Sequence, residues 1–398
     1  MSTSSLRVVV AMSGGVDSSV AAYLLKEQGY DVLAIFMKNW HDESVTISPE
    51  CPWLEDSYDA MIVAQKLKIP FQVIDLSSQY KDKIVDYMFS EYGIGRTPNP
   101  DILCNREIKF EIFLQIALNL NANYIATGHY AQVESKELEG KKVYYLKSGK
   151  DKDKDQSYFL CQLNQDQLSK TLFPIGHLKK SDVRRIAKNN GLITANKKDS
   201  QGLCFIGKVK LPEFLQQKLK KKEGDVILIP NNLKLYKKRV GDGNLKNNSK
   251  GFLYSDDMGA LVGKHPGAHF YTVGQRKGLA IGGMSKPLFV IGTDIKKNII
   301  YVGEGGEHYG LYRSSLRVNK KKMHHVIPGF DLINHNNLFA RIRYRQPLQA
   351  VRIEQDEKFY ILSFSVKQKS IAKGQFVAIY SDNYIVSSGV IDLSLIHI

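Results

Sequence analysis

The segment of residues 8–19 carries the residue types best suited to chemistry. It reads Val-Val-Val-Ala-Met-Ser-Gly-Gly-Val-Asp-Ser-Ser, a β-branched run that leads into a glycine-rich turn and a helical pattern. A strand, a glycine-rich turn and a helix N-terminus together form an anion site, because the first N–H groups of the helix point outward and its dipole favours negative charge. Gly14 and Gly15 let the main chain approach an anion closely. We therefore predict a phosphate cradle here.

Asp17 is the residue of this turn that an ordinary serine-capped turn explains least well. A carboxylate beside a phosphate is repelled unless a cation such as Mg²⁺ bridges the two. The turn is not a Walker A loop, because no lysine follows its glycines. Residues 259–264 look more like a Walker A loop, but they are one residue short and His265 stands where Ser or Thr is needed. We therefore predict one nucleotide site, at residues 13–18.

Cys104 is the first candidate nucleophile, preceded by Asn99-Pro100-Asp101. We expect a helix from about residue 105 to residue 120, which places Cys104 at its start, where the dipole favours a thiolate. Arg106 and Lys109 act in the same direction, and Asp101 can reach the same space as an acid or base. The alternative is a helix-cap cysteine with no role.

The other three cysteines carry weaker signals. Cys204 lies between Gly202 and Gly207, which indicates a loop, and by itself it is better explained as inert. Cys51 precedes a proline and Cys161 lies in an apolar run, so both are interpreted as structural. With no C-x-x-C pair and no histidine at zinc-site spacing, we expect no structural metal.

Three arginines alternate near the C-terminus, at positions 341, 343 and 345. In a strand that runs from residue 339 to residue 345 their side chains share one face. Guanidinium groups in a row repel one another unless an anion neutralises them, and a phosphate backbone is the natural counter-charge. The alternative is a solvated edge strand.

The elements that must position these residues alternate as strand and helix over the first 130 residues. This alternation predicts a doubly wound parallel sheet with ligands at the carboxyl ends of its strands, where residues 13–18 and Gly128-His129 both fall. The expected strands are residues 32–36, 71–76 and 124–127, and the expected helices are residues 19–28, 57–67, 78–92 and 105–120.

The remaining chain divides less clearly. Residues 140–156 are charged and are interpreted as an exposed loop, and residues 165–190 as helical. Lysine-rich segments near residues 208–222 and 235–250 indicate a small middle domain, and short β-type runs from about residue 280 predict an antiparallel barrel or sandwich. We expect domains over residues 1–208, 209–280 and 281–398.

Bulk properties point to a polyanionic partner. The 398 residues carry 56 Lys and Arg against 40 Asp and Glu, a formal net charge of +16. Nucleic acid is the first expectation and an anionic membrane the second, with solubility alone as the alternative. No apolar run has the length of a membrane span, and the N-terminal pattern is not that of a signal peptide. We expect a cytoplasmic protein.

The loop Ser-Gly-Gly-Val-Asp-Ser resembles the pyrophosphate loop of the ATP pyrophosphatase superfamily, and the chain as a whole resembles the bacterial tRNA-specific 2-thiouridylase (MnmA) family. The matching segments follow the family's order over almost the whole length. They are residues 11–19, 99–110, 126–130, 154–160, 199–207, 271–283 and 343–346. The main departure is the stretch near residues 231–257, which is interpreted as an insertion in the middle domain.

The resemblance implies a role for each matching residue. Those that bind ATP, with Mg²⁺, would be Ala11, Met12, Ser13, Gly14, Gly15, Val16, Asp17, Ser18, Met37 and Gly128. Asn99, Pro100 and Asp101 would contact the target base of the anticodon loop. Further tRNA contacts would come from His129, Lys154, Asp155, Gln156, Arg343, Tyr344 and Gln346.

The resemblance also implies a reaction. Cys204 would accept a persulfide sulfur from a cysteine desulfurase or a relay protein, and Cys104 would pair with it in a disulfide as sulfur is delivered, with Asp101 as acid or base. The sulfur would replace O2 of the wobble uridine after adenylation of that oxygen. The alternatives are a 4-thiouridine synthase, an amidotransferase-type synthetase, a lysidine synthase, or a non-catalytic basic RNA-binding protein.

Overall fold

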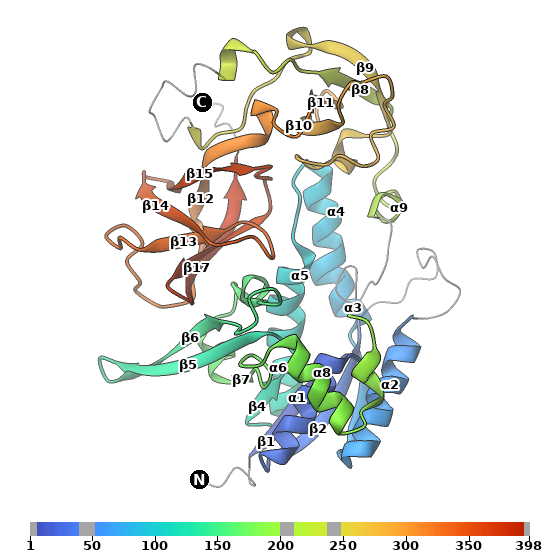
Figure 1. The fold of residues 1–398 in the computed structure, drawn as a ribbon, viewed down its shortest axis with the longest axis vertical. Helices are drawn as coiled ribbons and strands as arrows, with labels where there is room; N and C mark the ends of the chain where they lie inside the picture. Colours follow the sequence, from blue (N-terminus) through green and yellow to red (C-terminus); the bar gives the residue numbers. More distant parts are fainter. Residues whose placement is uncertain (1–5, 40–51, 200–210, 237–247, 394–398) are drawn as a thin grey trace.

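A computed structural model describes residues 6–39, 52–199, 211–236 and 248–393. The chain forms three units in succession (Figure 1). The N-terminal unit lies at one end, a unit built from the middle of the sequence lies at the other, and the C-terminal unit packs beside the helices that run between them.

The N-terminal unit is built on a parallel sheet in the order β3-β2-β1-β4-β7. The strands are β1 (Arg7–Met12), β2 (Asp31–Lys38), β3 (Phe71–Asp75), β4 (Tyr124–Ala126) and β7 (Thr171–Leu172). β1 is central because Val8, Val9 and Val10 are fully buried, and such apolar runs are typical of a sheet covered on both faces.

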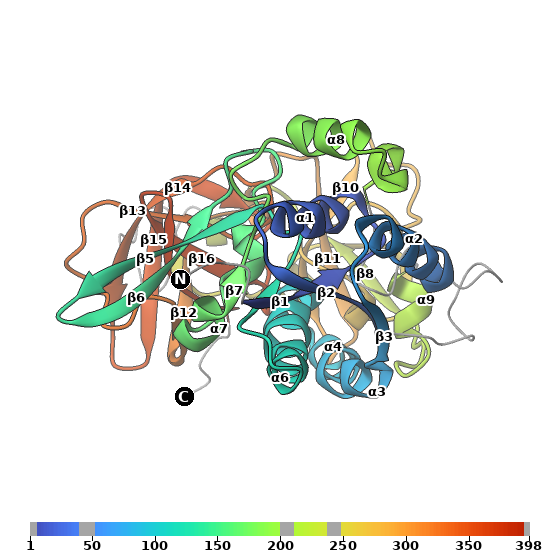
Figure 2. The same cartoon turned by 90° about the horizontal axis from the view of Figure 1, so that it is seen from below.

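Helices cover both faces of this sheet, as Figure 2 shows. On one face lie α1 (Val16–Glu27), α2 (Pro52–Leu67) and α8 (Lys180–Asn189). On the other lie α3 (Ser77–Tyr80), η2 (Lys81–Val85), α4 (Asp86–Gly93), α5 (Pro100–Leu103), η3 (Cys104–Ile112) and α6 (Phe113–Asn119), in which η2 and η3 are π-helical. Val8 and Val10 pack toward the first set, and Val9 toward the second. The predicted doubly wound sheet is confirmed.

The segment after β4 differs from the sequence prediction. Residues 140–156, expected as an exposed loop, begin with strand β6 (Lys141–Ser148), which forms a hairpin with β5 (Ala131–Leu138). The charged residues favoured a loop prediction, but a strand can carry them here because most of the hairpin is exposed or only partly buried. The expected helix over residues 165–190 is broken into α7 (Gln165–Ser169), β7 and α8.

The middle unit is a four-stranded sheet in the order β10-β11-β8-β9. Its elements are α9 (Leu211–Leu215), β8 (Gly224–Leu228), β9 (Ala260–His265), β10 (Leu288–Asp294) and β11 (Ile299–Glu304). The sequence prediction placed residues 287–302 in the C-terminal domain, but β10 pairs with β11 and β11 pairs with β8, so both strands belong to the middle unit. The Walker-like residues 259–264 lie mostly in β9 and form no phosphate loop.

The C-terminal unit is an antiparallel barrel, which β12 closes by pairing with both β15 and β17. Its strands are β12 (Tyr312–His325), β13 (Leu338–Arg341), β14 (Gln349–Gln355), β15 (Phe359–Lys369), β16 (Phe376–Ser381) and β17 (Tyr384–Asp392). β17 also pairs with β6, so the hairpin of the N-terminal unit extends the barrel sheet.

Short 3₁₀ helices occur at several places along the chain. They are η4 (Ser157–Leu160), η5 (Ile193–Asn196), η6 (Asp256–Met258), η7 (Ala268–Phe270) and η8 (Tyr309–Leu311).

Candidate active site at the N-terminus of helix α1

The predicted phosphate cradle joins β1 to α1. Gly14 has φ +68°, and a Cβ there would lie 2.1 Å from the Asp56 carbonyl oxygen, so both backbone conformation and packing require glycine. The Ser18 and Ser19 hydroxyls donate to the Gly15 carbonyl at 3.2 and 2.8 Å, which holds the turn. Gly15 is the N-cap residue of α1, and as a glycine it offers no side chain to accept from the first N–H groups of the helix. The first N–H groups of the helix therefore remain suited to an external anion.

The end of β4 packs directly against this turn. A Cβ on Gly128 would lie 2.6 Å from the Ser18 nitrogen, so only glycine lets the two segments touch. Met37, at the end of β2, is 3% exposed and packs in the core on the α3–α6 side of the sheet. The structure therefore brings Gly128 to the cradle, while a nucleotide contact by Met37 stays a prediction.

A cavity of about 440 Å³ opens beside the cradle. Its lining comes from the N-terminal unit and from the turn after β13 of the barrel. The lining residues are Ser13, Gly15, Val16, Asp17, Asp101, Asn105, Lys109, His129, Tyr130, Lys154, Gln156, Phe159, Lys180, Lys198, Asp199, Tyr344 and Arg345. Five are Lys or Arg and three are Asp, so the lining has a formal charge of +2, which favours an anionic ligand.

Asp17 is held on the cavity wall by two partners that the sequence analysis missed. Both carboxylate oxygens accept from the Lys180 ammonium at 2.8 Å, and Oδ1 also accepts from the Tyr130 hydroxyl at 2.7 Å. Burial and the Asp17 charge raise the pKa of Tyr130 far above its usual range, so it stays a neutral donor. Tyr130 lies two residues after Gly128, so its position just after β4 could have placed it at the site from the sequence. Nothing near Lys180 in the sequence points to the site.

Asp199 is a second carboxylate bound by Lys180, at 2.8 Å. It also pairs with Lys154 at 2.7 Å and Arg184 at 3.0 Å. Burial alone raises its pKa, but Lys154 and Lys180 outweigh burial and hold the pKa of Asp199 well below its usual range. Asp199 therefore stays ionised, and Lys154 is engaged with it at the cavity wall.

The helix that carries Cys104 begins earlier than predicted. Asn99 is its N-cap, with Oδ1 accepting from the Ile102 N–H at 3.2 Å, and Pro100 occupies the first turn. The Asn-Pro pair was the usable sequence signal. Cys104 is consequently the fifth helical residue and fully buried, so the expectation of a cysteine at the helix start is wrong. The helix dipole acts mainly within the first turn.

One side of this helix faces the cavity. Asp101, Asn105 and Lys109 recur at a spacing of four and all line it. Arg106 instead pairs with Glu107 at 2.8 Å and donates to Gln162 at 2.9 Å. Lys109 therefore lines the cavity and Arg106 binds Glu107 and Gln162, while the effect of either residue on the Cys104 thiol stays a prediction.

The remaining cysteines separate into described and undescribed positions. Cys161 is fully buried, and burial raises the pKa of its thiol to about 12, which fits the predicted structural role. Cys51 and Cys204 lie outside the described residues. The predicted pairing of Cys104 with Cys204 is therefore still a prediction.

His129 and Gln156 line the cavity as neutral groups. Burial, followed by the charge of Lys109, lowers the pKa of His129 well below its usual range. Its Nδ1 lies 2.6 Å from the Thr127 hydroxyl, which orients the ring. The Gln156 amide oxygen accepts from the Tyr130 N–H at 3.0 Å.

The predicted strip of three arginines is wrong. β13 ends at Arg341, and the chain then turns, with Arg345 at φ +63°. Arg341 points inward and pairs with Asp155 at 3.0 Å, with side chains only 9% and 2% exposed. Asp155 also accepts from two backbone N–H groups, so neither side chain is available to RNA.

The turn after Arg341 supplies the barrel's wall of the cavity. Tyr344 lies 4.5 Å from Phe159 between ring centroids, and Arg345 lies over the Tyr344 ring. Gln346 holds this turn by accepting from the Ile342 N–H at 2.9 Å and donating to Gln368 at 2.6 Å. Arg343 is exposed to solvent along part of its side chain, while its guanidinium donates to the Ser370 carbonyl and is buried enough that its pKa is lowered.

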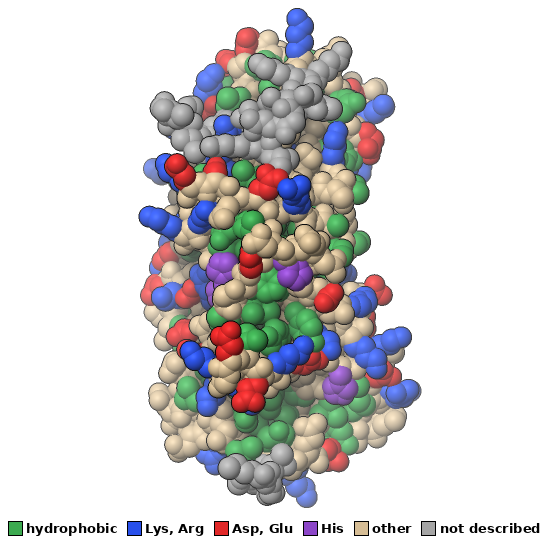
Figure 3. All heavy atoms as spheres, turned by 90° about the vertical axis from the view of Figure 1, so that its left-hand side faces the viewer, with side chains coloured by type: hydrophobic (Ala, Val, Ile, Leu, Met, Phe, Trp, Pro, Cys, Tyr) green, Lys and Arg blue, Asp and Glu red, His purple; other side chains and the backbone are tan. Residues whose placement is uncertain are grey.

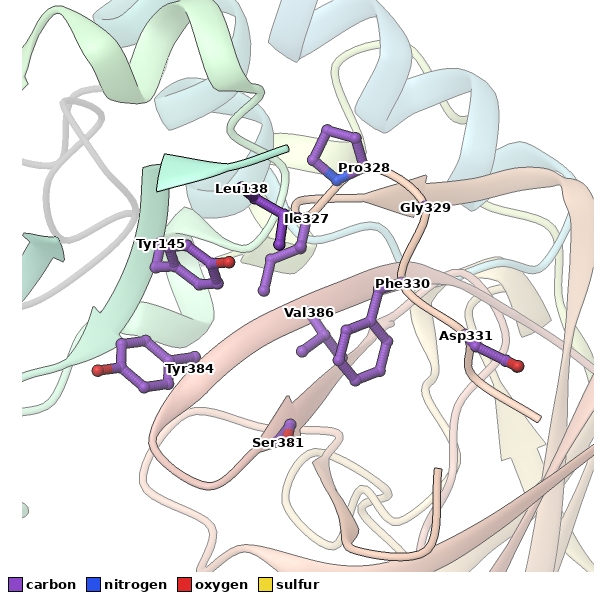
Figure 4. Close-up of a pocket in the computed structure, with 10 residues that line it drawn as sticks. All are labelled: Leu138, Tyr145, Ile327, Pro328, Gly329, Phe330, Asp331, Ser381, Tyr384 and Val386. Atoms are coloured by element: carbon purple, nitrogen blue, oxygen red, sulfur yellow. The ribbon is translucent and has the colours of Figure 1, made fainter. Parts of the chain in front are cut away.

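A second cavity, of about 350 Å³, lies between the β5–β6 hairpin and the barrel (Figure 4). Tyr145, Phe330 and Tyr384 dominate its lining, and Asp331 is its one charged residue. It has no phosphate cradle, and the first cavity remains the candidate active site. Figure 3 shows this side of the molecule, where apolar side chains gather along the middle and Lys and Arg are scattered around them.

No helix in the described ranges is long and apolar enough to cross a membrane. In the same ranges, no group of three or more His, Cys, Asp or Glu is arranged to hold a metal ion.

The class of protein follows from three family matches along the chain. Residues 6–208 match the family described as tRNA methyl transferase HUP domain. Residues 243–304 match the tRNA methyl transferase PRC-barrel domain, and residues 314–391 match the aminomethyltransferase β-barrel domain. The fold and the site therefore define an enzyme with an N-terminal HUP domain, a PRC-barrel and a C-terminal β-barrel.

Full-length relatives identify the particular family. The chain is 58% identical over 394 residues to the tRNA-specific 2-thiouridylase MnmA of Christiangramia forsetii, covering 97% of this chain and 99% of the relative. It is 58% identical to the protein of that name from Flavobacterium johnsoniae over 97% and 99%, and 45% identical to that of Halalkalibacterium halodurans over 97% and 94%. The chain belongs to the tRNA-specific 2-thiouridylase family of sulfurtransferases.

Proposed function

We propose that this chain uses ATP to transfer a persulfide sulfur to C2 of the wobble uridine of tRNA. The observation that carries the proposal is the shared cavity. One wall is the phosphate cradle with Asp17, another is the helix face with Asp101, and a third is the aromatic pair Phe159 and Tyr344. A nucleotide site, an acid–base group and a stacking surface therefore meet in one space.

Binding of ATP is supported by the cradle and by the charge of the lining. The N-terminus of α1 would hold the phosphates, with the main chain free to approach because of Gly14 and Gly15. Asp17 fits Mg²⁺, which proteins usually bind through one or two carboxylates together with substrate phosphates. Such an ion would screen the phosphate charge.

Binding of tRNA is supported by the aromatic and basic groups of the cavity. An RNA base in a loop can be splayed out and stacked on aromatic rings, and base-modifying enzymes act on such flipped bases. The rings of Phe159 and Tyr344 suit this role. Asn99, Pro100 and Asp101 would contact the flipped uridine, and Arg343 is exposed enough to reach the phosphate backbone.

The chemistry proceeds in three steps. Uracil O2 is a poor leaving group, so it first attacks the α-phosphate of ATP and pyrophosphate departs. The terminal sulfur of a Cys204 persulfide then attacks C2, and AMP leaves with the former O2. Attack of Cys104 on the inner sulfur frees the thiouridine and forms a Cys104–Cys204 disulfide, which an external thiol reduces. Asp101 accepts the N3 proton of the uracil as O2 is adenylated and returns it to N3 of the thiouridine. The persulfide comes from a cysteine desulfurase or a relay protein.

The test is to incubate the protein with ATP, a persulfide donor and bulk tRNA, and to analyse the nucleosides by mass spectrometry. We expect 2-thiouridine derivatives from the wild type, a large loss with Asp101→Asn, and full activity with Lys188→Ala, a charge change on the exposed side of α8. Formation of 4-thiouridine or lysidine instead would identify one of the alternative reactions. A protein that binds tRNA without releasing pyrophosphate would be a non-catalytic RNA-binding protein.

A further inference from the structure

Two carboxylates in the cavity share one ammonium group. The Lys180 Nζ lies 2.8 Å from both oxygens of Asp17 and 2.8 Å from Oδ1 of Asp199. The Lys180 side chain is only 12% exposed, and it comes from a helix 163 residues further along the chain than Asp17. The ion pair therefore links the phosphate cradle on α1 to α8.

The two carboxylates do not depend on Lys180 equally. Asp199 keeps Lys154 and Arg184 as further cationic partners. Within the described part of the chain, the only other partner of the Asp17 carboxylate is the neutral Tyr130 hydroxyl. Without Lys180, therefore, Asp17 would carry an uncompensated negative charge on the cavity wall until Mg²⁺ arrived with the nucleotide.

That charge matters because of where Asp17 lies. It is the second residue of α1, whose N-terminus is the anion site, and both line the same cavity. A bare carboxylate there would repel the phosphates that the helix end attracts. Lys180 is in place before a nucleotide arrives, so the cradle presents no net negative charge to it.

We propose that Lys180 is a phosphate-site residue, whose ammonium neutralises Asp17 and thereby lets the N-terminus of α1 bind the polyphosphate of ATP. This inference rests on the proposed function and adds a positioning residue to it. The backbone supports the placement, because Lys180 begins α8 and its N–H donates to the Asp151 carboxylate at 2.8 Å. Its ammonium also lies 5.7 Å from the centre of the Tyr130 ring, which directs the side chain toward Asp17.

The test measures binding of a non-hydrolysable ATP analogue to the full chain by calorimetry. Lys180→Met keeps the aliphatic stem and removes the charge, and we expect it to weaken binding by about 10- to 100-fold, the usual range for a hydrogen bond to a charged group. Lys180→Arg should restore most of the affinity. Lys188→Met, on an exposed position of the same helix, should leave it unchanged, and thermal melting should confirm that every variant is folded.

A double-mutant cycle decides whether Lys180 acts through Asp17. In an Asp17→Asn background the loss caused by Lys180→Met should shrink, because no carboxylate remains to be neutralised. An equal loss in both backgrounds would overturn the inference. So would a loss that shrinks in an Asp199→Asn background instead, because Lys180 would then act through Asp199.

The wild type separates this inference from the proposed function. Wild-type protein that binds the analogue, together with a Lys180→Met variant that binds it equally well, would refute the role of Lys180 alone. Wild-type protein that binds no ATP analogue would overturn both.

Discussion

Arg341 gives the sharpest test of the structure, because its expected role changed from RNA contact to internal ion pair. Its guanidinium pairs with Asp155 at 3.0 Å and lies 4.9 Å from the centre of the Tyr380 ring. Since Asp155 belongs to the N-terminal unit and Arg341 to the barrel, the pair joins the two. Arg341→Met removes the charge and keeps part of the packing of the stem.

The expected loss in the free energy of unfolding can be worked out from the partners that Asp155 keeps. Removing one member of a buried ion pair costs about 3–5 kcal/mol, because the other charge is left uncompensated. Asp155 keeps donors from the Gly149 and Ser157 N–H groups at 3.0 and 3.1 Å, so we expect the lower end, about 3 kcal/mol. At about 2–4 °C per kcal/mol for a unit of 150–250 residues, the melting temperature should fall by about 6–12 °C.

Thermal unfolding of the variant beside Arg352→Met provides the comparison. Arg352 lies on the same barrel with a side chain 83% exposed, so its loss should change stability by less than about 0.5 kcal/mol. Combining Arg341→Met with Asp155→Asn should recover part of the stability, because the buried charge is then absent.

Salt-dependent tRNA binding distinguishes the structural role from an RNA contact. Each phosphate contact adds about 0.7–0.9 to the slope of log affinity against log salt. Folded Arg341→Met should keep the wild-type slope, whereas Arg343→Met should lower it by about one such contact. An unchanged melting temperature for Arg341→Met, together with a reduced slope, would refute the internal ion pair.

Three further predictions concern the site. Asp17→Ala should abolish pyrophosphate release and leave tRNA affinity nearly intact, and unchanged release would argue against the cradle. Cys104→Ser and Cys204→Ser should each stop thiolation, whereas Cys161→Ser should retain it, and a trapped persulfide on Cys161 would contradict the proposed transfer. Because burial lowers the pKa of His129 well below 6.5, the folded protein keeps it neutral while the unfolded chain takes up a proton. Stability should therefore fall as the pH drops below about 6.5, and His129→Gln should flatten that fall in pH-dependent melting curves.

The sequence predicted the N-terminal sheet well because its signals are local. A β-branched strand, two glycines and a helical pattern lie within the first 28 residues, and the structure places the turn at the carboxyl end of β1 as expected. Gly128 was also placed correctly, because β4 runs parallel to β1 in the same sheet. Both predictions used only short segments and the geometry of parallel sheets.

The errors arose where long-range pairing overrides a local pattern. Residues 140–156 were predicted as a loop because they are charged, yet β6 pairs with β17, about 240 residues further on. Alternation predicted a continuous strand through the arginines, but the chain turns after β13 and Arg341 finds Asp155 in another unit. Lys180 could not be predicted, because only the fold brings α8 to the cradle.

One isotope measurement tests the central claim that uridine O2 leaves as part of AMP. tRNA carrying ¹⁸O at C2 of its wobble uridine is thiolated by the wild-type protein with unlabelled ATP, and the AMP released is weighed by mass spectrometry. The account predicts one ¹⁸O atom in AMP for each 2-thiouridine formed. Thiolation that yields unlabelled AMP would show that O2 was never adenylated and would contradict the mechanism.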